Sequence, residues 1–176
     1  KHRVTDVDAA TNTLKFEFND DIKASVLNVI PNMRAGDIAV NAGLATANKR
    51  WCEVDFLTFE SKAAKNVHVL GDSIQIAPGM PKSGHMANQH GKTCAAAVIA
   101  LLMGKQVNPM PIYNNTCYSF VSSKDVVHVA SVHRYDAEKK TMLTVPGSGG
   151  VSSAANELEG VYALAWAQNI WADTLA

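Results

Sequence analysis

The sequence predicts a mixed chain, with α/β character in its middle and an α+β unit at its C-terminal end. In the middle, the apolar run Val67–Leu70 stops at Gly71-Asp72, and a Pro/Gly-rich loop leads to a helical pattern over Lys82–Leu102. Toward the C-terminus, three strand patterns precede one long helical pattern. That order predicts a small antiparallel sheet packed with a terminal helix.

The N-terminal third predicts short strands and one helix. Val4–Asp8 and Thr13–Phe18 alternate apolar and polar residues around a short connection, which is typical of a β-hairpin. Ile22–Ile30 predicts a further strand, ended by Pro31. Ala35–Leu44 carries apolar residues at helical spacing and has a glycine near its end.

The C-terminal unit is predicted to begin after Asn108-Pro109-Met110-Pro111, where two prolines break any helix or strand. We therefore expect three domain segments, 1–30, 31–107 and 108–176. The last contains strands near Tyr113–Val121, Val126–His133 and Thr141–Val145, then a flexible connection at 146–152 and a helix over Ala154–Trp171.

Composition excludes several classes of protein. The chain has 176 residues, of which 47% are hydrophobic and 18% charged, so it is globular rather than disordered. Sixteen basic residues balance sixteen acidic ones, so no net charge attracts it to nucleic acid. No uncharged apolar stretch approaches the roughly 18–20 residues that span a bilayer, and Thr93–Gly104 predicts a buried helix instead.

The Gly71-Asp72 turn is the first candidate site. A strand that ends in Gly-Asp before a loop and a helix start suits the ribityl and phosphate part of a flavin nucleotide, although an ordinary turn fits the pattern equally well. Gly71 has no Cβ and lets backbone approach a ligand, and Asp72 can accept hydrogen bonds from hydroxyl groups. Lys82 is expected at the first turn of the helix, where its positive charge opposes the helix dipole. Either a ligand anion compensates this charge, or Lys82 is an exposed, solvated side chain.

The cysteines and histidines differ in what they can do. Three cysteines cannot all pair within the chain, and Cys94 lies in an apolar helix where it is expected to pack inertly. Cys117 lies in a polar strand segment, where its thiol is either accessible to reactants or merely half-buried. His85 and His90 on the predicted helix, and His128 and His133 on a strand, are each five residues apart and point away from each other, so no histidine metal site is expected. No Cys-x-x-Cys-His motif attaches a haem.

Motifs along most of the chain also occur together, in this order, in one known family. They are Trp51-Cys52-Glu53-Val54-Asp55, Thr58-Phe59-Glu60-Ser61, Val67-His68-Val69-Leu70-Gly71-Asp72, Met80-Pro81-Lys82-Ser83-Gly84, Asn115-Thr116-Cys117-Tyr118-Ser119 and Ser148-Gly149-Gly150-Val151. The set resembles the flavoprotein subunit of flavocytochrome c sulfide dehydrogenase, one of the glutathione-reductase-like flavoproteins with two dinucleotide-binding domains. The resemblance covers about Ile30 to the C-terminus.

The resemblance implies an organisation and a site. It implies that 1–30 is the tail of the second dinucleotide-type domain, 31–107 the C-terminal part of the FAD-binding domain, and 108–176 the family's C-terminal α+β domain. Cys117 would be catalytic, forming a redox-active disulfide with a cysteine beside the flavin ring. The implied FAD-binding residues are Gly71, Asp72, Pro81, Lys82, Ser83 and Trp166.

The resemblance also implies an enzyme that oxidises sulfide to sulfur or polysulfide and passes electrons through FAD to the haem of a separate c-type cytochrome subunit, in the periplasm. No Gly-rich turn for the FAD pyrophosphate precedes Arg34, so we expect the C-terminal part of a larger flavoprotein, inactive without its N-terminal half. Two alternatives are a relative of sulfide:quinone reductase and a cofactor-free interaction module. The last 36 residues contain no Lys or Arg, which disfavours docking on an anionic membrane.

Overall fold

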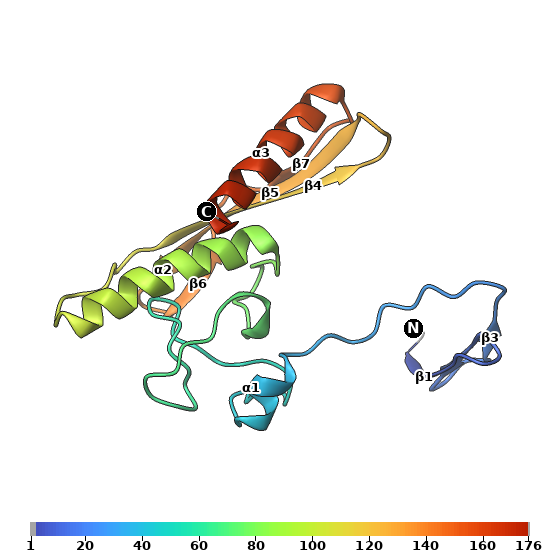
Figure 1. Ribbon diagram of the computed structural model, residues 1–176, viewed down its shortest axis with the longest axis horizontal. Coiled ribbons are helices and arrows are strands. Elements are labelled where there is room, and N and C mark those ends of the chain that lie inside the picture. Colours follow the sequence, from blue (N-terminus) through green and yellow to red (C-terminus); the bar gives the residue numbers. More distant parts are fainter. Residues whose placement is uncertain (1–2, 176) are drawn as a thin grey trace. The chain divides into compact units, whose positions relative to one another are not determined.

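The computed structural model describes residues 3–175 and has the mixed α+β architecture that the sequence predicts, with a C-terminal antiparallel sheet and a terminal helix (Figure 1). The chain forms two compact units, one that ends at Met33 and one that begins at Arg34. The boundaries predicted at residues 31 and 108 stay predictions.

The N-terminal unit is a three-stranded antiparallel sheet of β1 (Val4–Asp8), β2 (Thr13–Phe16) and β3 (Ile22–Lys23). The predicted hairpin is thus confirmed. The strand predicted over Ile22–Ile30 is wrong beyond Lys23, where β3 ends. Within the described residues, no neighbouring strand covers the apolar side chains that follow Lys23. Val26 and Ile30 are each 83% exposed.

The central segment contains helix α1 (Asp37–Asn41), the 3-10 turn η1 (Gly71–Ser73) and helix α2 (Gly84–Leu102). The helix predicted over 35–44 is therefore shorter than expected. The strand predicted at Val67–Leu70 is wrong: this segment forms only an isolated bridge between Glu60 and His68. Left-handed backbone at Phe59 and Asn66 bends the chain on both sides of the bridge, so no ladder can extend there.

Helix α2 begins two residues later than predicted. Ser83 is its N-cap, and its hydroxyl accepts a hydrogen bond from the Met86 N–H at 3.1 Å. Lys82 precedes the cap and lies in the loop, so its expected place in the first helical turn is wrong. The buried face of α2 consists of Met86, His90, Cys94 and Ala97, at helical spacing, which confirms Cys94 as a packing residue.

The C-terminal sheet contains β4 (Ile112–Phe120), β5 (Val126–Asp136) and β6 (Thr141–Thr144), antiparallel in that order. A short β7 (Gly150–Val151) also pairs with β5, so the predicted flexible connection at 146–152 is partly a strand. Helix α3 (Glu157–Leu175) covers this sheet along β5 (Figure 1).

One apolar core joins the central segment to the sheet. Ile74 and Met80 from the loops, Met86 and Cys94 from α2, and Tyr113 from β4 belong to the same buried cluster. Burial of these side chains holds the beginning of α2 against β4. The predicted site residues near Ser83 and Cys117 are thereby placed on two elements that share a core.

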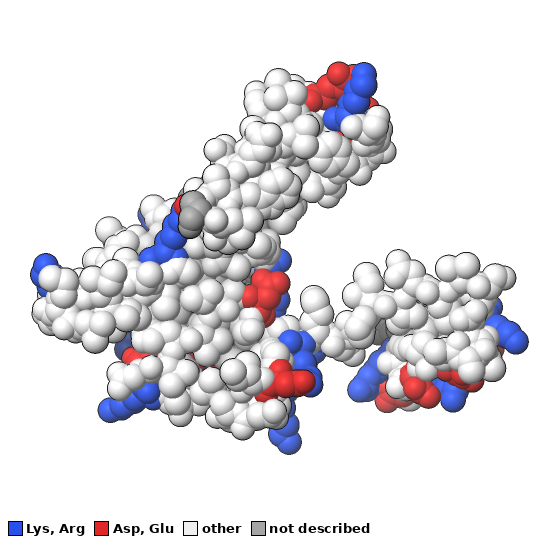
Figure 2. All heavy atoms as spheres, viewed as in Figure 1, with Lys and Arg blue, Asp and Glu red and all other residues white. Residues whose placement is uncertain are grey.

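The surface of α3 and its sheet carries few charges. Figure 2 shows a long uncharged surface over α3 and β4, and the charged side chains gather at the two ends of this surface. Large apolar side chains on α3 are more than half exposed, namely Leu158, Val161, Tyr162, Leu164, Trp171 and Leu175. Over residues 3–175, none of the helices combines the length and the apolar character that a membrane crossing requires.

Candidate functional site

The Gly71 turn packs closely against helix α2. Gly71 has φ +66°, and a Cβ at this position would lie 3.1 Å from the Cβ of Ala87. Its N–H donates to Nδ1 of buried His90 at 3.3 Å. The glycine was expected because it allows a close approach, and the structure shows that the approaching group is the helix. Contact of Gly71 and the exposed Asp72 with a flavin stays a prediction.

Lys82 is engaged by protein groups. Its Nζ donates to the backbone oxygens of Asp72 and Ile74, each at 2.6 Å, and lies 3.7 Å from the ring centroid of Trp51. Burial lowers the pKa of this ammonium. Lys82 therefore connects the η1 turn to the start of α2, and contact of Lys82 or of the preceding Pro81 with FAD stays a prediction.

The first turn of α2 is open to a ligand. The amides of Gly84 and His85 lie where an α-helix offers no intrahelical acceptor, and they carry the positive end of the helix dipole. A Cβ built at Gly84 would meet no heavy atom within 4 Å. A planar ring with electron density near one edge can therefore approach these amides.

Side chains of α2 fix the position of strand β4. The Asn114 N–H donates to Oε1 of Gln89 at 2.9 Å, and Nε2 of Gln89 donates back to the Asn114 carbonyl. One turn earlier, the Thr116 N–H donates to Nδ1 of His85 at 3.2 Å. Burial lowers the pKa of His85, which keeps the ring neutral as this bond requires.

Cys117 and Ser83 are linked through a buried amide. The Ser83 hydroxyl donates to Oδ1 of Asn115 at 2.6 Å, and Nδ2 of Asn115 lies 3.5 Å from Sγ of Cys117. Asn115 is 3% exposed, whereas Cys117 is only partly buried. The sulfur therefore has a polar partner on one side and access to reactants on another.

These residues border a cavity of about 300 Å³, which we call the Cys117 cavity. Trp166 closes it from α3, with its ring 5.5 Å from the His85 ring in an edge-on contact and 6.1 Å from Tyr118. The lining residues come from α2, β4 and α3: Ser83, Gly84, His85, Thr116, Cys117, Tyr118, Phe120, Ala163, Trp166 and Ala167. The lining of the Cys117 cavity therefore contains aromatic rings, helix amides and one thiol, and none of the described lining residues carries a carboxylate.

Of the seven predicted site residues, the structure brings Ser83, Cys117 and Trp166 together in this cavity and leaves the other four outside its wall. His85, Tyr118 and Asn115 were not predicted from the sequence as site residues. Asn115 could have been found, because alternation along a strand places it on the same face as Cys117. No sequence signal pairs His85 with Trp166, since that contact depends on how α3 packs.

The residues around the cavity fit a flavin ring. Flavins need donors near the electron-rich edge of the ring and apolar or aromatic cover over its face. The open first turn of α2 supplies the donors, and Trp166 and Tyr118 supply aromatic surface. At about 300 Å³ the cavity is at the lower end of ligand sites, which suits one part of FAD rather than the whole molecule.

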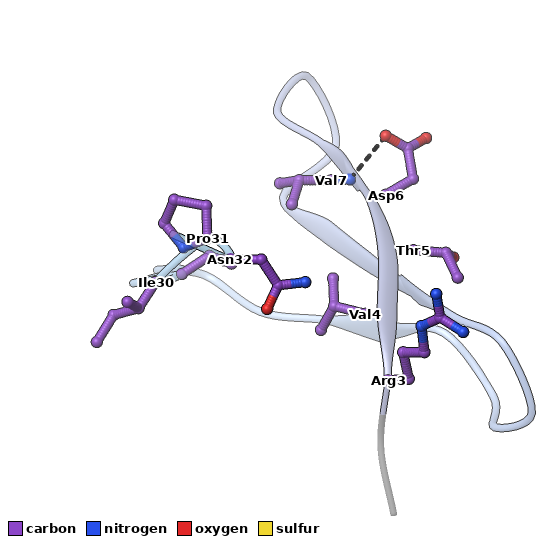
Figure 3. Close-up of a pocket in the computed structure, with 9 residues that line it drawn as sticks. Arg3, Val4, Thr5, Asp6, Val7, Ile30, Pro31 and Asn32 are labelled. Carbon is purple, nitrogen blue, oxygen red and sulfur yellow. Dashed lines mark hydrogen bonds between the residues drawn. The ribbon is translucent and has the colours of Figure 1, made fainter. Parts of the chain in front are cut away.

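Another cavity, of about 590 Å³, lies within the N-terminal unit (Figure 3). It is lined by Val4 and Thr5 from β1 and by Ile30, Pro31 and Asn32 from the segment after β3. It contains none of the predicted site residues. In the part of the chain that the structure describes, no group of three or more His, Cys, Asp or Glu side chains is arranged to hold a metal ion.

Comparison with protein families matches the C-terminal part of the chain. Residues 109–175 match the family model described as flavocytochrome c sulphide dehydrogenase, flavin-binding. This segment contains β4, Cys117 and Trp166, and so two of the three walls of the Cys117 cavity. The match confirms the resemblance over the C-terminal segment, which is similar to a flavin-binding domain of that kind.

Proposed function

We propose that this chain, whose C-terminal segment is a flavocytochrome c sulphide dehydrogenase flavin-binding domain, is part of an FAD-dependent enzyme that oxidises sulfide to sulfur or polysulfide. The observation that carries the proposal is the meeting of Cys117, the open first turn of α2 and Trp166 around one cavity. A reactive thiol beside an electron-accepting ring site is what transfer of electrons from sulfur requires.

The residues divide into three roles. Cys117 forms a disulfide with a second cysteine of the parent flavoprotein, and hydrosulfide attacks one sulfur of that bond. The S–S bond breaks, a persulfide forms on the attacked sulfur, and the other sulfur keeps the bonding electron pair as a thiolate. The first-turn amides at Gly84 and His85 bind the electron-rich edge of the ring, and Trp166 excludes water from its face. When bound, FAD would supply the two-electron acceptor for this exchange, and the electrons would pass one at a time to the haem of a c-type cytochrome subunit.

The surface of α3 supports a multi-part assembly. Its exposed apolar side chains form the kind of surface that other protein usually covers. We propose that the N-terminal half of the flavoprotein and the cytochrome subunit provide this cover in the periplasm. A relative of sulfide:quinone reductase is less well supported, because the matched family is of the cytochrome-linked type.

The test is reduction of flavin by sulfide in the parent flavoprotein. Cys117→Ser is expected to abolish sulfide-dependent bleaching of the flavin absorbance, because no disulfide can then form at the cavity. Cys94→Ala is the matched control. Cys94 lies on the buried face of α2, so this substitution should leave the reduction of flavin intact. Unchanged reduction kinetics in Cys117→Ser would refute the role of Cys117, and a parent protein without flavin would refute the proposal as a whole.

A further inference from the structure

We infer that Asn115 is a positioning residue for the Cys117 sulfur, an inference that rests on the function proposed for Cys117. Its amide donates a hydrogen bond to Sγ and so stabilises the thiolate over the thiol. The orientation of this amide follows from the hydrogen bond that Ser83 donates to its oxygen.

The Ser83 hydroxyl has one proton to donate. Its oxygen already accepts the Met86 N–H at 3.1 Å as the cap of α2. That proton is directed at Oδ1 of the Asn115 side chain, which lies at 2.6 Å. Because Oδ1 accepts it, the amide nitrogen of Asn115 is turned away from Ser83.

Fixing the oxygen fixes the nitrogen. Nδ2 of Asn115 then lies 3.5 Å from Sγ of Cys117, within the range of hydrogen bonds to sulfur, and Oδ1 lies 3.6 Å from it. The thiol can donate weakly to Oδ1, but a thiolate is a strong acceptor and takes the N–H. Asn115 is 3% exposed, so water does not compete effectively for this donor.

The chain of contacts runs from the helix to the sulfur. The Met86 N–H polarises the Ser83 hydroxyl, which polarises the Asn115 amide, and the amide faces Cys117. The positive end of α2 therefore acts on the sulfur as well as on the cavity. In the exchange with hydrosulfide, this donor favours Cys117 as the sulfur that keeps the bonding pair as a thiolate, so the persulfide forms on its partner cysteine.

The test measures alkylation of Cys117 in the reduced chain, without flavin or sulfide, so it is independent of the enzyme's activity. Iodoacetamide reacts with thiolate, and modification of the Cys117 peptide is followed by mass spectrometry at pH 7 and at pH 10, where thiols generally ionise. Asn115→Leu keeps the size of the side chain and removes the donor. We expect alkylation about tenfold slower at pH 7, and within about twofold of the parent rate at pH 10.

Three further variants sharpen the outcome. Asn115→Asp keeps the shape but replaces the N–H with a negative charge, and should be slower than Asn115→Leu at pH 7. Ser83→Ala frees the amide to turn over and should slow alkylation about two- to threefold at pH 7, whereas Ser83→Thr keeps the hydroxyl and the parent rate. Far-UV circular dichroism verifies that each variant folds.

Two results would overturn the inference. An unchanged rate at pH 7 in both Asn115 variants would show that the amide does not act on the sulfur. Equal slowing at pH 7 and pH 10 would show that Asn115 affects only access to the cavity. If Asn115→Leu fails to fold, the Ser83→Ala and Ser83→Thr pair decides by the same comparison. Loss of sulfide activity in Cys117→Ser together with unchanged alkylation in the Asn115 variants would leave the proposed function standing and remove this inference alone.

Discussion

At the scale of single residues, the turn before α2 shows how one motif serves packing and a candidate site together. Gly71 needs a positive φ and also a missing Cβ, because Ala87 lies directly opposite. Lys82 holds the carbonyl oxygens of the same turn. The turn therefore keeps its shape through the protein's own contacts.

The two requirements at Gly71 can be separated by mutation. Gly71→Ala should lower the free energy of unfolding by about 2–3 kcal/mol, since the left-handed backbone and the 3.1 Å contact with Ala87 both oppose a side chain. Gly43 has a similar φ, +72°, but no atom within 4 Å of its built Cβ, so Gly43→Ala should cost only about 1 kcal/mol. Urea unfolding measures both, and equal losses would mean that packing against Ala87 contributes nothing.

The candidate site could be predicted only in part from its residues. Cys117, Ser83 and Trp166 were predicted from the family resemblance, and the structure places all three on one cavity. Lys82 was assigned to a ligand or to solvent, and its actual partners are carbonyl oxygens and Trp51, which lies 31 residues earlier in the chain. Such partners are set by tertiary packing, which no local pattern encodes.

At the scale of elements, helix α3 is attached to the sheet through a glycine. Gly160 is buried near the start of α3, where glycine is normally unfavourable in a helix. A Cβ at this position would lie 2.2 Å from the backbone oxygen of Lys124. The helix can therefore approach the loop between β4 and β5 only because this side chain is missing.

Substitution of Gly160 should displace the helix. Gly160→Ala is expected to lower the free energy of unfolding by about 2–3 kcal/mol, because the backbone of Lys124 cannot move aside as a side chain would. Gly91 in α2 is the matched control: a Cβ there meets nothing within 4 Å, so Gly91→Ala should stabilise by about 0.5–1 kcal/mol. Denaturant unfolding distinguishes the two, and stabilisation by Gly160→Ala would show that α3 does not pack this closely.

The elements that could be predicted were those with a strong local period. The hairpin at the N-terminus, helix α2 and strands β4 to β6 all follow apolar spacing. Val67–Leu70 failed because an apolar run becomes a strand only where a neighbour completes its hydrogen bonds. The short β7 was missed for the converse reason, since β5 supplies the partner and Gly150 gives no apolar signal.

At the scale of the whole molecule, the core contains a neutral histidine. His90 is 1% exposed, and its ring lies 4.7 Å from the tilted ring of Phe59 and 5.0 Å from Tyr113 in an edge-on contact. Nδ1 accepts the Gly71 N–H, so the proton lies on Nε2, which has no hydrogen-bond partner within the described residues. Burial, with the positive charge of Lys82, lowers the pKa of His90 to about 4.

This lowered pKa makes the fold sensitive to acid. The unfolded chain binds the proton near the ordinary histidine pKa of 6.5, whereas the folded chain resists it until about 4. The contribution of neutral His90 is therefore complete above pH 6.5 and is lost as the pH falls toward 4, by about 3 kcal/mol in total. Urea unfolding at a series of pH values should show this decline. His90→Asn retains an acceptor for the Gly71 N–H and should flatten this pH dependence. His85 and His133, whose pKa values burial also lowers, keep part of the slope. Met142→Ala, on β6, weakens the same core without removing the titrating group or the rings packed on it, so its curve should run below the parent curve and parallel to it. A His90→Asn curve that is itself parallel to the parent would show that His90 does not couple folding to pH.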